Sequence, residues 1–258
     1  MIFITYSQST IFIKFVHKEN NYLEDQITKK INILLPGGIK QFEDLLVQNS
    51  IRGIHALIIG PGCEPAALSL LENFADINIT ADDYNSVMQI RLKLKDEDRI
   101  KVKMMDYTHT DFEDEYFDLI YAQGSISVPE RKDIIKEIKR ILTGNGLLCA
   151  GEIVSLKEPV PGFVSDIWEQ SGLEPLASTG IKQYYESRGF EIISEQDLSE
   201  TLRDFYEKIR SAVLKADKDE KEQDKKYFSR MKHESHTYLK LGGDKFIGFN
   251  SLIMRKKN

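Results

Sequence analysis

Residues 56–65, ALIIGPGCEP, join a short apolar run to a Gly-Pro-Gly turn. A short apolar run that stops at glycines is typical of a buried strand whose backbone then passes close to another group. Pro65 suits the first turn of a helix, because its missing N–H would have no partner there. The stretch therefore predicts a strand, a tight turn at Gly60 and Gly62, and a helix that begins at Pro65.

The residues that follow repeat this alternation of strand and helix. Four more apolar runs predict strands at residues 77–81, 100–105, 117–121 and 147–153. Residues 131–142 carry isoleucines on one helical face, which predicts an amphipathic helix. The apolar side chains of residues 88–94 fit both the alternation of a strand and the spacing of a helix. The crossover that parallel strands require favours a helix. Apolar strands separated by helices indicate a parallel sheet that is covered on both faces.

The rhythm changes after Ile153. Helices are expected at 163–169, 181–187, 198–213 and 227–239, and strands at 190–194 and 246–254. Residues 2–4 and 11–16 are rich in strand formers, and their role is left open. We predict three regions: an N-terminal segment with cap helices at 1–50, a core at 51–154, and a helical region with the last strands at 155–258.

Composition narrows the functional classes. The chain has 258 residues, 41% of them hydrophobic, and a formal net charge of −6 with acidic and basic residues interspersed. This charge argues against a nucleic-acid partner. Two cysteines are too few for a disulfide framework and suggest a reducing compartment. Neither a signal peptide nor a membrane-spanning run is recognised, so we expect a cytoplasmic protein without membrane insertion.

Ligands of open parallel sheets bind beyond the carboxyl ends of the strands, near the switch in strand order. Residues at these predicted ends should therefore lie together. They are Gly60 and Gly62 after the first strand, Asp82 and Asp83 after the second, Asp106 and Tyr107 after the third, and Gln123, Gly124 and Ser125 after the fourth. Glycine backbone, carboxylates and aromatic rings suit a ligand that carries a nucleoside.

With these motifs in this order, the chain resembles the class I, Rossmann-like S-adenosylmethionine-dependent methyltransferases. It is most similar to their small-molecule branch, which includes the ubiquinone/menaquinone-biosynthesis type. The resemblance covers roughly residues 36–153, from PGGIKQFEDLL through INITADDYN and KVKMMDYTHTDF to ILTGNGLL. It implies a mostly parallel, seven-stranded α/β sheet with helices on both faces. The helical C-terminal insertion begins directly after the fifth strand, whose carboxyl end faces the predicted site, so we expect it to act as a lid.

The resemblance also implies roles for individual residues. Gly60, Pro61 and Gly62 would meet the methionine part of S-adenosylmethionine, and Asp83 would hold its ribose hydroxyls. The remaining expected cofactor-binding residues are Tyr84, Asp106, Tyr107, Gln123 and Gly124. The implied substrate is a small-molecule methyl acceptor. Beside what the resemblance implies, Ser125, Trp168, Tyr184 and Tyr185 are candidate contacts to this acceptor, and for Trp168, Tyr184 and Tyr185 core packing is an equal alternative.

Two positions depart from the family pattern. Ile58 stands where the family often has an acidic residue in the first strand. Glu64 replaces a common third glycine, at the positive end of the expected helix. We expect Glu64 to face the amino-acid end of the cofactor rather than the core, because a buried, unpaired carboxylate is costly.

No catalytic base is identified, and transfer between aligned reactants does not require one. His109, His233 and His236 are expected on the surface, and Cys63 and Cys149 as small buried fillers. No cluster has metal-ligand spacing, so no metal is expected. Two other functions stay open: a non-catalytic cofactor-binding or regulatory protein, with dimerisation to a homodimer left open, and a nicotinamide-dependent dehydrogenase. The missing third glycine disfavours the dehydrogenase.

Overall fold

The computed structural model describes residues 33–47, 51–216 and 222–257. The strand formers at 2–4 and 11–16 lie outside this part. The strands are β1 (Gly53–Ile59), β2 (Phe74–Ala81), β3 (Ile100–Met104), β4 (Phe117–Gln123), β5 (Leu142–Ser155), β6 (Leu176–Ala177), β7 (Phe190–Asp197) and β8 (Ile247–Lys256). The helices are α2 (Lys40–Val47), α3 (Glu64–Leu70), α4 (Tyr84–Lys93), α5 (Arg131–Ile141), α6 (Gly162–Gln170), α7 (Ile181–Glu186), α8 (Thr201–Ala216) and α9 (Glu222–Lys240), with the short 3-10 turn η2 (Gly243–Lys245).

The strands form one sheet in the order β3-β2-β1-β4-β5-β8-β7, and β6 pairs with β5. Neighbours from β3 to β5 are parallel, whereas β8 is antiparallel to both β5 and β7. The chain thus forms the mostly parallel α/β sheet that the sequence predicts, and residues 88–93 belong to helix α4, with Leu94 as its C-cap. The order reverses between β1 and β4, which is where open sheets of this kind bind ligands.

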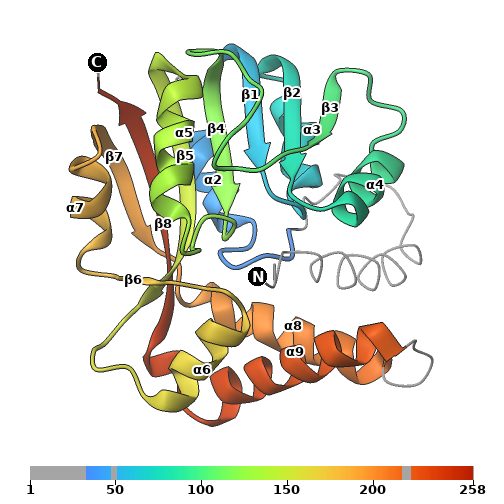
Figure 1. Ribbon diagram of the computed structural model, residues 1–258, viewed down its shortest axis with the longest axis vertical. Helices are drawn as coiled ribbons and strands as arrows, with labels where there is room; N and C mark the ends of the chain where they lie inside the picture. Colours follow the sequence, from blue (N-terminus) through green and yellow to red (C-terminus); the bar gives the residue numbers. More distant parts are fainter. Residues whose placement is uncertain (1–32, 48–50, 217–221, 258) are drawn as a thin grey trace.

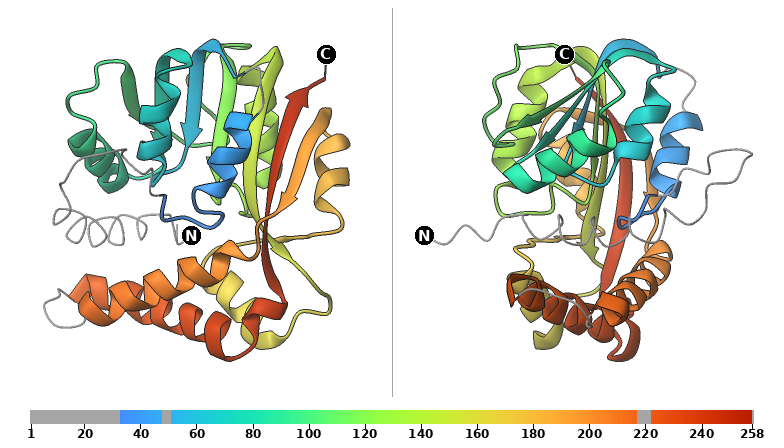
Figure 2. Two further views of the ribbon diagram at one scale, coloured as in Figure 1. Left: turned by 180° about the vertical axis from the view of Figure 1, so that it is seen from behind. Right: turned by 90° about the vertical axis from the view of Figure 1, so that its right-hand side faces the viewer.

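Two apolar layers cover the sheet. One packs α2, α3 and α4 against it and is centred on residues such as Phe42, Leu70 and Ile90. The other packs α5 and α7 through residues such as Ile138 and Tyr185. Figure 2 shows α2 and α3 on the face opposite α5.

A third apolar cluster holds together what we call the helical layer: α6, α8 and α9. It joins Trp168, Leu202 and Tyr238 to the sheet residues Ile153 and Phe249. Figure 1 shows this layer beyond the carboxyl ends of the parallel strands, while α7 lies beside β7. The predicted helix at 181–187 is therefore present, but it covers the sheet and does not belong to the helical layer.

Candidate functional site

The turn after β1 lies at the switch point of the sheet. Gly60 and Gly62 have φ angles of 99° and 95°, a region that side chains with a Cβ rarely adopt. A Cβ on Gly60 would lie 2.8 Å from the Cβ of Ser125, which follows β4. Both glycines are thus required by conformation, and at Gly60 also by close approach, as the sequence predicts for this turn.

Glu64 differs from its expected role. Helix α3 begins at Glu64, one residue before Pro65. The Glu64 side chain is buried, and its Oε1 accepts a hydrogen bond from Lys93 Nζ at 2.9 Å. The expectation that this carboxylate avoids burial is wrong, because the ammonium group of Lys93, from the end of α4, neutralises it. Ile58, in the position of the missing acid, is also buried and belongs to the apolar core.

Two neighbouring carboxylates end β2, and each has different surroundings. Asp83 is the N-cap of α4, where its Oδ1 accepts the N–H of Ser86 at 3.0 Å. Oδ1 of Asp82 is shielded from solvent and accepts no hydrogen bond from another described residue. Burial, followed by the charges of Asp83 and Asp106, raises the pKa of Asp82 to about 6. Asp82, which the sequence suggests as a helix cap or a bystander rather than a cofactor contact, therefore has an environment that suits a ligand.

Residues that follow β3 and β2 complete this part of the edge. Asp106 is exposed, and its Oδ1 accepts hydrogen bonds from the N–H and hydroxyl of Thr108 at 2.8 and 2.7 Å. Tyr107 is buried in the apolar layer under α5, and its hydroxyl is 3.5 Å from the carbonyl oxygen of Thr80. Tyr84, in contrast, is 66% exposed directly after the aspartate pair. An exposed ring beside carboxylates is suited to stack on a base.

Gln123 and Gly124 end β4 at the same edge. Gly124 has a φ angle of 73° and donates its N–H to the carbonyl oxygen of Gly151 at 2.8 Å. Gln123 is buried and faces the turn at Pro36 to Gly38, to which its side chain is hydrogen-bonded. The cofactor candidates thus share one edge of the sheet, although Gln123 is engaged by the protein itself.

The four substrate candidates do not form one cluster. Ser125 donates its hydroxyl to the carbonyl oxygen of Ile59 at 2.7 Å, beside the glycine turn. Trp168 lies in the core of the helical layer, and its Nε1 is buried with no acceptor among the described residues. Tyr184 packs under the guanidinium of Arg188, 3.4 Å from the ring centre. Tyr185 is buried on the face of the sheet that α7 covers.

A buried polar network surrounds Glu152 of β5, and our reading of the sequence missed it. Glu152 Oε2 accepts hydrogen bonds from Arg131 Nε at 2.7 Å and Ser127 Oγ at 3.2 Å, and Oε1 accepts one from the hydroxyl of Tyr185. Burial raises the pKa of Glu152, while Arg131 and Tyr185 act in the opposite direction. The signal was a single glutamate inside the apolar run LLCAGEIV, since a buried charge needs a partner.

The other reactive side chains match their expected places. His109, His233 and His236 are exposed. Cys63 and Cys149 are buried, and burial raises the pKa of both thiols, that of Cys149 to about 12. Within residues 33–47, 51–216 and 222–257, no group of three or more His, Cys, Asp or Glu side chains is placed to hold a metal ion. None of the described helices is long and apolar enough to span a membrane.

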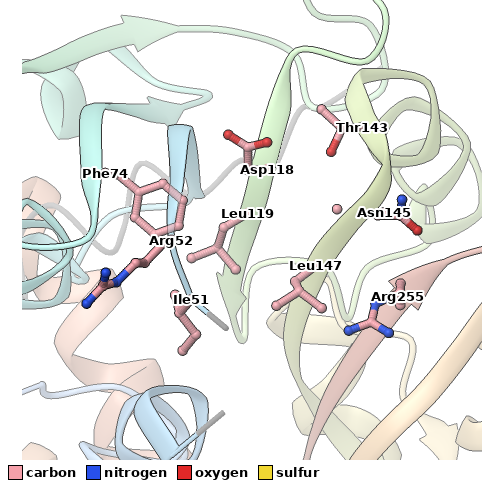
Figure 3. A pocket seen from close by; sticks show the side chains of 10 residues that line it. Ile51, Arg52, Phe74, Asp118, Leu119, Thr143, Asn145, Leu147 and Arg255 are labelled. Carbon is pink, nitrogen blue, oxygen red and sulfur yellow. The ribbon is translucent and has the colours of Figure 1, made fainter. Parts of the chain in front are cut away.

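One pocket of about 390 Å³ lies at the amino ends of the parallel strands, at the opposite end of the strands from the glycine turn. Figure 3 shows its lining, in which Ile51 and Arg52 precede β1, and Phe74 begins β2. Asp118 also lines it, but this carboxylate accepts the N–H groups of Ile54 and His55 at 2.7 and 3.2 Å. Asp118 thus supports local structure, and the pocket is separate from the glycine turn.

Comparison with known proteins agrees with this geometry. Residues 57–150 match the sequence family described as a methyltransferase domain. No curated protein sequence matches the chain.

Several solved structures share the fold at low identity. Phosphoethanolamine N-methyltransferase 2 of Haemonchus contortus, in complex with S-adenosyl-L-methionine, is 16% identical with a TM-score of 0.74, over 98% of this chain and 58% of that one. The [4+2]-cyclase SpnF is 18% identical with a TM-score of 0.71, over 97% and 96%. The cyclopropane synthase MmaA2 of Mycobacterium tuberculosis is 16% identical with a TM-score of 0.70, over 84% and 83%. The chain therefore has the Rossmann-like methyltransferase fold, and its segment 57–150 matches the methyltransferase domain.

Proposed function

We propose that this protein binds S-adenosylmethionine at the carboxyl ends of β1 to β4 and transfers its methyl group to a small-molecule acceptor. The observation that carries the proposal is the Gly60–Gly62 turn at the switch point of the sheet, inside the segment that matches the methyltransferase domain. Similar solved structures are complexes with S-adenosylmethionine, which supports the same cofactor. A place in the ubiquinone/menaquinone-type branch remains a prediction from the sequence.

The residues present fit this cofactor. The glycine turn offers backbone without side chains, and Asp82 and Asp83 offer carboxylate oxygens for hydroxyl groups. Asp106 and the ring of Tyr84, both exposed, would contact the base. The bound cofactor would supply a methyl group activated by a sulfonium centre. The protein would then contribute orientation and exclusion of water, which can lower a barrier by about 7–11 kcal/mol.

Calorimetric titration of the purified protein tests the proposal. S-adenosylmethionine and S-adenosylhomocysteine are expected to bind, and NAD is expected not to bind. Binding of NAD alone would instead support a dehydrogenase. Mass spectrometry of ligands that stay bound through purification would then identify the class of acceptor.

The alternative is a cofactor-binding or regulatory protein that transfers no methyl group. Two observations favour it: β1 has the buried Ile58 in place of an acid, and Glu64 is paired with Lys93. One protein of similar fold, SpnF, is a [4+2]-cyclase, so the fold alone does not imply methyl transfer. Tight binding of S-adenosylmethionine, without conversion to S-adenosylhomocysteine in the presence of cell extract as an acceptor source, would support this alternative.

A further inference from the structure

The side chain of Gln123 is saturated by hydrogen bonds within the protein. Its Nε2 donates to the carbonyl oxygens of Pro36 and Gly38, both at 2.8 Å. Its Oε1 accepts the hydroxyl of Tyr121 at 2.7 Å, and the Cys63 sulfur lies 3.9 Å away. An amide has only two N–H donors, so Gln123 keeps none for a ligand.

This network also fixes the orientation of the amide. Exchanging its oxygen and nitrogen would place an oxygen against two carbonyl oxygens, which cannot donate. Burial, followed by the nearby Cys63 and Cys149, raises the pKa of Tyr121 well above its ordinary value, so its hydroxyl stays protonated and donates. Gln123 is therefore a fixed clamp on the turn that precedes α2.

The turn that Gln123 holds, Leu35–Gly38, contacts the Gly60–Gly62 turn on one side and the junction of the sheet with the helical layer on the other. The Leu35 side chain packs on Gly62, 3.2 Å from the position that a Cβ would take. Gly37 packs against the ring of Phe249, the residue of β8 on which the helical layer packs. The N–H of Gly37 donates to the hydroxyl of Thr201, the first residue of α8, at 3.1 Å. One short turn thus connects the cofactor-binding glycines to the helical layer.

We propose that Gln123 is a positioning residue, which holds the Leu35–Gly38 turn against the Gly60–Gly62 turn and so fixes one wall of the cofactor site. The clamp on the turn follows from the hydrogen bonds alone, whereas its effect on cofactor affinity rests on the proposed function. This role replaces the direct cofactor contact that the sequence suggests for Gln123.

The variant Gln123→Glu provides the sharpest test. Its ionised carboxylate would face two carbonyl oxygens, and we expect S-adenosylhomocysteine to bind at least about tenfold more weakly at pH 8. When the carboxyl is protonated, its O–H can donate to one of the two carbonyls. The ratio of variant to wild-type affinity should therefore recover as the pH is lowered to about 5.5.

Other titrating groups near Gln123 do not produce this recovery. Tyr121 and Cys63 face it directly, and burial raises the pKa of both well above this range. Glu64, next to Cys63, is paired with Lys93. Cys149 from β5 and Asp44 from α2 act on Tyr121 from the neighbouring elements. Because wild type carries all these groups and Asp82 as well, the ratio of affinities isolates residue 123.

Two further variants separate positioning from a merely structural role. Gln123→Met loses the same hydrogen bonds without a charge, so its weaker binding should not depend on pH. Thr201→Val frees the Gly37 N–H but keeps the clamp, so its affinity should stay within about twofold of wild type. Equal binding by Gln123→Glu and wild type at pH 8, or a loss that lower pH does not reverse, would overturn the proposed effect on affinity.

Hydrogen exchange without ligand distinguishes this inference from the proposed function. The peptide that contains residues 35–38 should exchange faster in Gln123→Glu than in wild type at pH 7.5. If wild type does not bind S-adenosylhomocysteine, the proposed function fails, and this exchange comparison alone decides whether Gln123 holds the turn. Unchanged exchange at 35–38 would remove the positioning role.

Discussion

Asp82 and Asp83 follow one another in sequence, yet their side chains have different tasks. Asp83 caps α4 through the N–H of Ser86, and a cap of this kind contributes about 1 kcal/mol to stability. Burial raises the pKa of Asp82, and its Oδ1 accepts no hydrogen bond from another described residue. Alanine at Asp83 would remove the helix cap as well as any contact with the ligand, so a loss of binding could not be assigned to either. Asparagine is the better substitution, because it caps as well as aspartate does.

Asp83→Asn should weaken S-adenosylhomocysteine binding about tenfold or more while the melting temperature stays near that of wild type. The expected cause is the loss of a charged acceptor for the ribose hydroxyls. Calorimetry measures the affinity, and Asp82→Asn is the matched control. A larger loss in the control would assign the ribose to Asp82, and full binding by both variants would contradict the proposed site.

The pKa of Asp82 predicts a pH dependence of stability. Because this pKa rises from an ordinary 3.8 to about 6 on folding, the folded protein binds the proton more tightly than the unfolded chain. The contribution of Asp82 to the free energy of unfolding therefore falls as the pH rises from about 4 to about 6 and is constant above that range.

Asp82→Asn should remove this contribution. The free energy of unfolding of the variant minus that of wild type should therefore be more positive at pH 7 than at pH 4. Urea denaturation at the two pH values measures it. A difference between the two proteins that does not change with pH would show that folding leaves the pKa of Asp82 at its ordinary value.

Single residues also show where sequence reasoning ends. The positive φ angles of Gly60 and Gly62 could be anticipated, because a strand-to-helix turn leaves few other conformations. The pairing of Glu64 with Lys93 could not, since 29 residues separate the two and only the placement of α3 and α4 on the same face of the sheet brings them together. The saturated amide of Gln123 depends in the same way on a turn more than 80 residues earlier.

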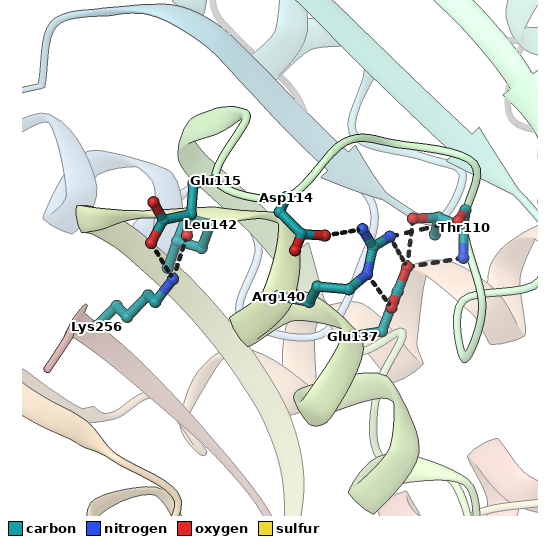
Figure 4. Close-up of polar contacts among 7 residues, drawn as sticks. All are labelled: Thr110, Asp114, Glu115, Glu137, Arg140, Leu142 and Lys256. Atoms are coloured by element: carbon teal, nitrogen blue, oxygen red, sulfur yellow. Dashed lines mark hydrogen bonds and ion pairs between the residues drawn. The ribbon is translucent and has the colours of Figure 1, made fainter. Parts of the chain in front are cut away.

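At the scale of elements, α5 anchors the loop between β3 and β4, which carries Asp106 and Tyr107. Glu137 of α5 accepts the N–H and hydroxyl of Thr110 at 2.8 and 2.6 Å, and it forms an ion pair with Arg140. Arg140 also binds Asp114, as Figure 4 shows. Burial opposes ionisation of Glu137, but the hydrogen bonds from Arg140 and Thr110 outweigh it and lower the pKa to about 2.

Glu137→Ala should lower the free energy of unfolding at pH 7 by about 1–3 kcal/mol, because charged hydrogen bonds to a buried group are lost. This contribution is present above the ordinary pKa of 4.5 and is lost as the pH falls toward 2, so wild type and variant should converge in acid. Urea denaturation measures it, with Lys136→Ala, an exposed position on the same helix, as the control. Equal stability of Glu137→Ala and the control at pH 7 would contradict the anchor.

The elements themselves were largely predictable. Continuous apolar runs placed the parallel strands, and a period-3.6 pattern placed α5, within a few residues. The strands are buried on both faces of the sheet, whereas the helix buries one regular face. The two-residue β6 was missed, because so short a strand has no pattern of its own. The position of α7 was also missed: its attachment to the sheet depends on the Tyr185–Glu152 contact, which no local pattern reveals.

At the scale of the whole molecule, the helical layer and the sheet meet around Phe249 and Ile153. The Leu35–Gly38 turn lies at this junction, through Phe249 and Thr201. Ligand bound at the glycine turn would therefore contact a segment that also holds the first residue of α8. We propose that the helical layer acts as a lid, which would exclude water and favour a small acceptor over a macromolecular one.

Hydrogen exchange with and without S-adenosylhomocysteine tests the lid. We expect new protection in residues 161–170, which include α6, and around Gly37, because cofactor binding would order the turn that joins the two layers. Protection should not extend to α7, since Tyr185 already fixes that helix to Glu152, and its peptide serves as the internal control. Protection confined to the turns after β1 to β4 would show instead that the helical layer is a fixed support, which packs on the sheet and does not respond to the cofactor.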